Sequence, residues 1–128
     1  RADGRTHVCY HWHGEILELL PLALRLGFDA IEPVCNSYET TDTIAKVRRV
    51  VGDRITIMGG VTAEDLEFRG AGEIEPMVRD AIRQGGRNAR FMLIPSDVPQ
   101  SAPLSPELSA NYVEFMDAGL RHGTFPIR

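Results

Sequence analysis

A pattern that repeats four times constrains the fold of this 128-residue chain more than any other feature. Each repeat is a short apolar run followed by a stretch with helical spacing. The apolar runs cover residues 6–10, 28–34, 55–61 and 90–96, and the helical stretches cover 15–26, 43–51, 73–84 and 106–121. Strands that alternate with helices of this length predict consecutive βα units and a parallel sheet.

Four βα units are half the inventory of an eight-stranded βα barrel, which takes roughly 250 residues. The sequence also begins at Arg1 rather than at a methionine. We therefore expect an α/β fold in which residues 1–128 form a single partial domain, the C-terminal half of a TIM-type (β/α)8 barrel. Two open sheet edges would then need covering, by a missing N-terminal half or by a second copy of the chain.

Charge and hydropathy narrow the class of partner. The net charge is −4. The arginines are spread over helix faces and loops with acidic residues between them, and they include Arg48, Arg49, Arg79, Arg83, Arg87 and Arg90. A solvated helix surface explains these arginines better than a phosphate-binding stripe, so no nucleic-acid partner is expected. No apolar run approaches the roughly 20 residues of a membrane span. Two cysteines indicate a reduced, cytoplasmic setting rather than a disulfide scaffold.

Several residues predict where the helices begin and end. Ser105 before Pro106 is an N-cap followed by a first-turn proline. Pro21 must kink the first helical stretch or mark a second start. Gly27, and the pair Gly85-Gly86, are placed to end their helices in the left-handed conformation. The last helix carries an apolar stripe that predicts a core-facing side, formed by Leu108, Tyr112, Phe115, Met116 and Leu120.

Candidate site residues follow from the rule that parallel βα folds place their sites at the carboxyl ends of the strands. His7 and Cys9 lie two apart on the first predicted strand, so their side chains project to one face. An imidazole and a thiolate on one cavity-lining face suit Zn²⁺. A packed cysteine beside a hydrogen-bonded histidine is the alternative. His11 and His13 follow as further potential ligands or as a solvated loop.

The other strand ends supply weaker candidates. Glu32 near the end of the second strand, or Cys35 just past it, is a candidate third metal ligand. A loop anchor is the alternative for Glu32, because it precedes a proline. Gly59 and Gly60 allow a cofactor or substrate to approach the backbone, although a tight turn explains them as well. Asp97 after the fourth strand is a candidate catalytic acid, base or ligand, or a turn residue that binds backbone N–H groups.

The order of these motifs resembles the uroporphyrinogen decarboxylase superfamily, which includes zinc-dependent corrinoid methyltransferases. The resemblance runs from about residue 6 to 123, as the C-terminal half of that family. It is carried by the His7-Val8-Cys9 strand, the turn into the next strand at 27–34, the glycine-bearing strand end at 57–61, and the blocks 91–97 and 103–107.

The resemblance implies a βα barrel and a methyltransferase that moves a methyl group from a corrinoid to a zinc-bound thiol. Zinc and a corrinoid would be its cofactors, and a small molecule or a corrinoid protein its partner. His7 and Cys9 would bind the zinc, with Asp97 or Glu32 third. The chain departs from the family pattern at Tyr10, where the methyltransferases have glycine, and near Ser96, where they have a ligand cysteine.

Two alternatives remain from the sequence. One is decarboxylation of a tetrapyrrole, uroporphyrinogen, in porphyrin biosynthesis, although the histidine that decarboxylases carry in the block 91–97 is absent. The other is a truncated half-barrel without catalysis. Zinc content distinguishes the methyltransferase from the decarboxylase, and the oligomeric state tests whether the chain is a half-barrel without catalysis.

Overall fold

The computed structural model describes residues 4, 6–36, 43–87 and 89–127, and within these ranges the chain is an α/β protein. The strands are β1 (Cys9–His11), β2 (Ala30–Glu32), β3 (Thr56–Val61) and β4 (Phe91–Pro95). The helices are the 3-10 turn η1 (Leu17–Leu19), α1 (Leu20–Leu26), α2 (Ile44–Val51), α3 (Ala63–Phe68), α4 (Ile74–Gly86) and α5 (Pro106–His122). The predicted α/β class is confirmed.

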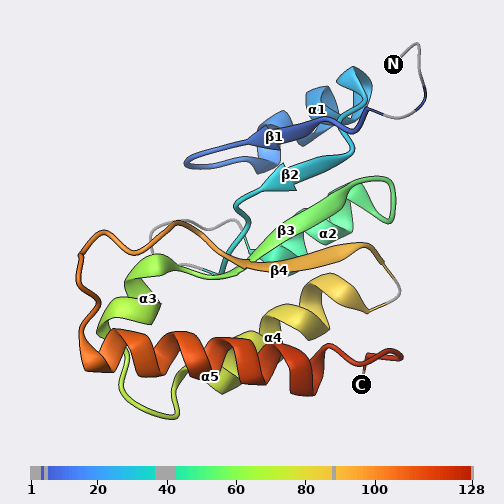
Figure 1. The fold of residues 1–128 in the computed structure, drawn as a ribbon. Coiled ribbons are helices and arrows are strands. Elements are labelled where there is room, and N and C mark those ends of the chain that lie inside the picture. The colour runs from blue at the N-terminus through green and yellow to red at the C-terminus, as the bar shows by residue number, and fades with distance from the viewer. Residues whose placement is uncertain (1–3, 5, 37–42, 88, 128) are drawn as a thin grey trace.

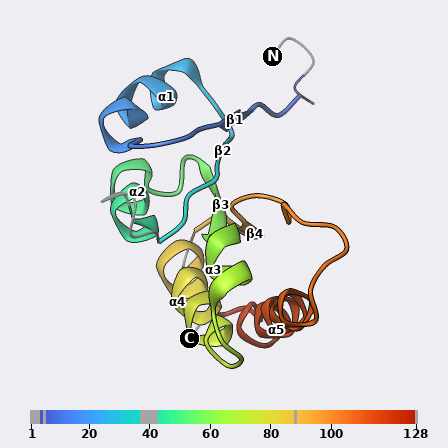
Figure 2. The same cartoon turned by 90° about the vertical axis from the view of Figure 1, so that its left-hand side faces the viewer.

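The four strands form one parallel sheet in the order β1-β2-β3-β4 (Figure 1). Each crossover between neighbouring parallel strands is expected to be right-handed, and sequential right-handed crossovers place every connecting helix on the same face. Figure 2 shows α1, α2 and α4 along one side of the sheet in this way. The predicted organisation in parallel βα units is therefore confirmed.

The core lies between the sheet and these helices. A row of residues in register runs across all four strands, namely Tyr10, Ile31, Ile57 and Phe91. Ile31 and Ile57 are fully buried, in one cluster with Val47 of α2 and Ala81 of α4. A second cluster joins Val61, Val78 and Phe115 under α4 and α5.

The opposite face of the sheet has a different composition. Its side chains come from the alternate positions, because successive strand residues point to opposite faces. Cys9, His11 and Met92 are exposed, whereas Glu32 and Met58 are half-buried. Among the described residues no helix packs over this face, which we call the uncovered face (Figure 2).

The predicted helix boundaries hold at three of four places. The Ser105 hydroxyl accepts a hydrogen bond from the Leu108 N–H at 3.0 Å, and Gly27 ends α1 in the left-handed conformation. Pro21 lies in the first turn of α1, directly after η1, so it marks a second start. The prediction for Gly85-Gly86 is wrong, because both residues lie inside α4. Gly85 is needed there for packing, since a Cβ atom would come within 2.3 Å of the Phe91 ring.

The apolar stripe of α5 is buried only in part. Leu108 and Phe115 are 3% and 4% exposed, as predicted, whereas Met116 and Leu120 are 59% and 76% exposed. The core-facing prediction is wrong for these last two residues because α5 contacts the molecule through α3 and α4 on one side only. The short helix α3, which the apolar pattern does not predict, supplies part of that contact.

Arg48 also differs from its prediction as a solvated surface residue. Its guanidinium is partly buried and donates to four backbone carbonyl oxygens, those of Gly52, Ile55, Gly85 and Arg90. Burial lowers the pKa of this guanidinium, and the Asp53 carboxylate partly opposes the shift. Arg48 therefore joins α2 to the loops before β3 and β4.

None of the helices in the described ranges has the length and apolarity that crossing a membrane requires.

Candidate functional site

The strongest group of chemically active side chains lies on the uncovered face, where β1 and β2 end. His11 and Glu32 are register partners in the sheet, and Cys9 lies two residues before His11 on the same face. The His11 Nδ1 atom is 3.6 Å from the Glu32 Oε1 atom. An imidazole and a carboxylate thus pair at the carboxyl ends of two neighbouring strands, and the Cys9 thiol lies on the same face at the start of β1.

His13 extends this group into the loop after β1. Its Nε2 atom lies 3.0 Å from the His11 Nε2 atom, and the two rings meet edge to face. At that distance one ring donates its N–H to the lone pair of the other, and the tautomers decide which ring is the donor. The His11 side chain is 57% exposed, which leaves it free to turn.

Cys9 has a partly apolar environment. Its thiol lies 3.8 Å from the Met58 sulfur, across the sheet on β3. Burial raises the pKa of the Cys9 thiol, and the neighbouring Glu32 carboxylate raises it further. Without a cation nearby, Cys9 is therefore protonated at neutral pH.

His7 lies apart from this group. Its Nδ1 atom is 3.6 Å from the Asp29 Oδ1 atom, at the start of β2, and its side chain is 82% exposed. Asp29 also accepts a hydrogen bond from the Val8 N–H at 2.7 Å. Of the three metal ligands expected from the sequence, the structure groups Cys9 with Glu32 and places His7 beside Asp29.

The glycine pair at the end of β3 serves internal packing. A Cβ atom on Gly59 would lie 1.8 Å from the Val34 carbonyl oxygen, and Gly60 has a φ of 152°. The Gly60 N–H points at the Cys35 sulfur at 3.3 Å. Burial raises the pKa of Cys35 to about 11. The close approach expected at these glycines is thus made by the chain's own segment after β2.

Asp97 follows β4, at the far edge of the sheet. Its Oδ1 atom accepts a hydrogen bond from the Val98 N–H at 2.7 Å, the turn contact that the sequence left open. Three strand spacings separate β4 from β1, or about 14 Å along the sheet. Asp97 and Cys9 therefore do not meet in this structure.

The donor set on the uncovered face matches zinc in kind, because zinc takes sulfur, imidazole nitrogen and carboxylate oxygen. The side chains are close in pairs, as with His11 and Glu32. However, within the described ranges no three of the His, Cys, Asp and Glu side chains are already gathered for a metal ion. Side-chain rotation would have to complete such a site.

Sequence reasoning did not include the two methionines of the uncovered face, Met58 and Met92, which are register partners on β3 and β4. The two-residue period of the strands 55–61 and 90–96 is the signal that places them there.

No family model matches this chain, and no curated protein matches it either.

Proposed function

We propose that the chain is half of a βα barrel and that the uncovered face lines its cavity. Sequential strand order with the helices on one side leaves the other face without a layer, and closure of a barrel buries such a face. Polar and sulfur-bearing side chains on that face support this assignment, since an ordinary sheet face awaiting a helix layer is apolar.

On this face the chain binds zinc and a small thiol, and the reaction is methyl transfer from a corrinoid to that thiol. The observation that carries the proposal is the pairing of His11 with Glu32 at the carboxyl ends of β1 and β2, with Cys9 on the same face of β1 and near enough to Glu32 for its charge to act on the thiol. In βα barrels this end of the strands holds the active site. His11 takes the place that the sequence motif gave to His7, because His11 lies beside Glu32.

Bound zinc supplies one chemical effect, which is to lower the pKa of a coordinated thiol and so make a thiolate at neutral pH. The residues of the chain do the rest. Cys9 and His11 offer sulfur and nitrogen from one strand face, and Glu32 orients the His11 ring from the neighbouring strand. Met58 of β3 lies with its sulfur 3.8 Å from the Cys9 sulfur and gives the thiol an apolar neighbour.

Zinc content tests the proposal directly. The chain, purified without chelator, is expected to carry about one zinc ion per site by elemental analysis. Cys9→Ser and His11→Ala should lose it, because each removes a protein ligand of the zinc ion. His7→Gln is the matched control, since it removes a histidine of the same segment that faces Asp29 instead.

Two results contradict the proposal. A purified chain that takes up no zinc after incubation with the metal excludes the zinc reading and leaves the decarboxylase alternative. Loss of zinc in His7→Gln but not in His11→Ala would show that the metal lies at the start of β1, away from Glu32.

A further inference from the structure

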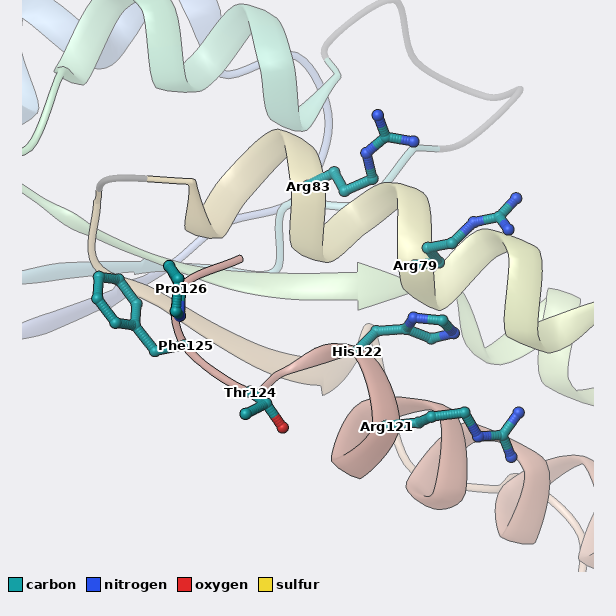
Figure 3. A pocket seen from close by; sticks show the side chains of 7 residues that line it. All are labelled: Arg79, Arg83, Arg121, His122, Thr124, Phe125 and Pro126. Atoms are coloured by element: carbon teal, nitrogen blue, oxygen red, sulfur yellow. The ribbon is translucent and has the colours of Figure 1, made fainter. Parts of the chain in front are cut away.

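A polar pocket lies between α4 and the end of α5, away from the uncovered face (Figure 3). Its volume is about 580 Å³, in the range of small-molecule sites. Seven residues line it: Arg79, Arg83, Arg121, His122, Thr124, Phe125 and Pro126. We name it the arginine pocket.

Two helices bring the cations of this pocket together. Arg79 and Arg83 are four residues apart on α4, so they share one face of the helix. Arg121 and His122 come from the last turn of α5, which packs beside α4. Figure 3 shows Arg79, Arg121 and His122 extending in one direction, away from Phe125 and Pro126, and Arg83 extending from α4 beside them. The sequence places Arg79 and Arg83 more than 35 residues from Arg121, so this convergence is a property of the fold.

One carboxylate holds part of the cluster in place. Glu75, in the first turn of α4, accepts from Arg121 Nη1 at 2.6 Å and from His122 Nε2 at 2.8 Å. The hydrogen bond from His122 and that from Arg121 lower the pKa of Glu75, so it is ionised at neutral pH. Glu75 fixes the two α5 side chains, and the remaining N–H groups of Arg121 stay available.

The charge of the pocket remains positive after this contact. Among the described residues that line it there is no carboxylate, and none of the described ion pairs involves Arg79 or Arg83. Three guanidinium groups therefore line the pocket, and Glu75 is in ion-pair contact with one of them, in a chain whose net charge is −4. A local excess of positive charge on an acidic protein attracts an anion selectively.

We propose that the arginine pocket binds a diphosphate group, either free or as part of a nucleotide. Guanidinium groups bind phosphate oxygens through paired N–H donors, and three of them across 580 Å³ fit two linked phosphates better than one small anion. The Thr124 hydroxyl adds a neutral donor. Phe125 and Pro126 form an apolar wall at one end, against which a planar ring can stack.

Titration calorimetry with two probes, inorganic pyrophosphate and ADP, tests this site. Both are expected to bind, and rising sodium chloride should weaken both because the contacts are between charges. The double variant Arg79→Gln and Arg83→Gln should lose about tenfold or more in affinity. Both side chains are exposed, so the fold should survive, which circular dichroism checks.

Arg49→Gln is the matched control. Arg49 is an exposed arginine on α2 outside the pocket, so this change alters the net charge without removing a lining side chain. The proposal would be overturned if Arg49→Gln and the double variant lost the same affinity for each charge removed. It would also be overturned if neither probe showed saturable binding. Tighter binding of ADP assigns the apolar wall to the base, and equal binding assigns the site to diphosphate alone.

Discussion

The two thiols of this chain differ in solvent exposure and in their neighbouring groups, so they should differ in reactivity. Cys9 is exposed on the uncovered face, with Glu32 near its sulfur, whereas Cys35 is buried under Gly60 and Val61. Nearby negative charge and burial both favour the neutral thiol over the thiolate. Only Cys9 is exposed to solvent, and its pKa is raised by burial first and by the Glu32 charge second.

Alkylation rates can separate these contributions. In the native chain iodoacetamide should modify Cys9 alone, and in denaturant both cysteines. Since the pKa of Cys9 is raised, its rate should still be rising with pH above the ordinary thiol range. Glu32→Gln removes the neighbouring negative charge and should shift that profile to lower pH. An unchanged profile in Glu32→Gln would show that burial alone sets the pKa of Cys9.

Neighbouring arginines on α2 offer a second comparison between single residues. Arg48 donates to four backbone carbonyls, while Arg49 is exposed. Arg48→Met should reduce the free energy of unfolding by about 2–4 kcal/mol, because carbonyls lose charged donors. Arg49→Met should stay within about 0.5 kcal/mol. Urea unfolding followed by circular dichroism measures both, and equal effects would contradict the structural role of Arg48.

Among the elements, α4 packs on β4 only because Gly85 has no side chain. The helix crosses β4 at Gly85, where a Cβ atom would lie 2.3–2.8 Å from three atoms of the Phe91 ring. The next residue, Gly86, has room, with its nearest neighbours at 3.7 Å. Close contact between helix and strand therefore needs glycine at one position of the pair and not at the other.

Substitution of each glycine by alanine tests this contact. Gly85→Ala should destabilise the protein by about 1–3 kcal/mol through overpacking against Phe91. Gly86→Ala should be neutral or stabilising by up to about 1 kcal/mol, since alanine favours the helix. Thermal unfolding of both variants measures the difference. A stabilised Gly85→Ala variant would contradict the close contact of α4 with the Phe91 ring.

At the scale of the whole molecule, the sequence predicts the four strands and the helices that follow them, apart from α3, because periodicity is a local signal. The Ser105 cap and the Gly27 helix end follow from residue chemistry alone. The function of Gly85, the role of Arg48 and the grouping of His11 with Glu32 depend on contacts between distant segments. The same holds for the arginine pocket, whose cations look like solvated surface in the sequence.

The two lateral edges of the molecule each expose apolar surface. At the β1 edge an apolar groove of about 220 Å³ is lined by side chains that include Trp12, Leu22 and Leu26. The Trp12 indole Nε1 is buried there without a hydrogen-bond partner among the described residues. At the β4 edge, α5 exposes Val113, Met116 and Leu120 at helical spacing. Apolar faces at both ends of an open sheet favour association.

Sedimentation analysis can test whether these edges pair. The isolated chain is expected to sediment as a species larger than a monomer. When a second copy closes the sheet, the exposed α5 side chains Val113, Met116 and Leu120 and the apolar groove at β1 bury each other. Leu120→Lys places a charge in that contact and should shift the chain toward the monomer. Phe68→Lys is the matched control, since Phe68 is similarly exposed, at 78%, but lies on α3, whereas the stripe lies on α5. A monomeric chain, or equal dissociation by both variants, would show that the lateral edges of the sheet do not bind one another.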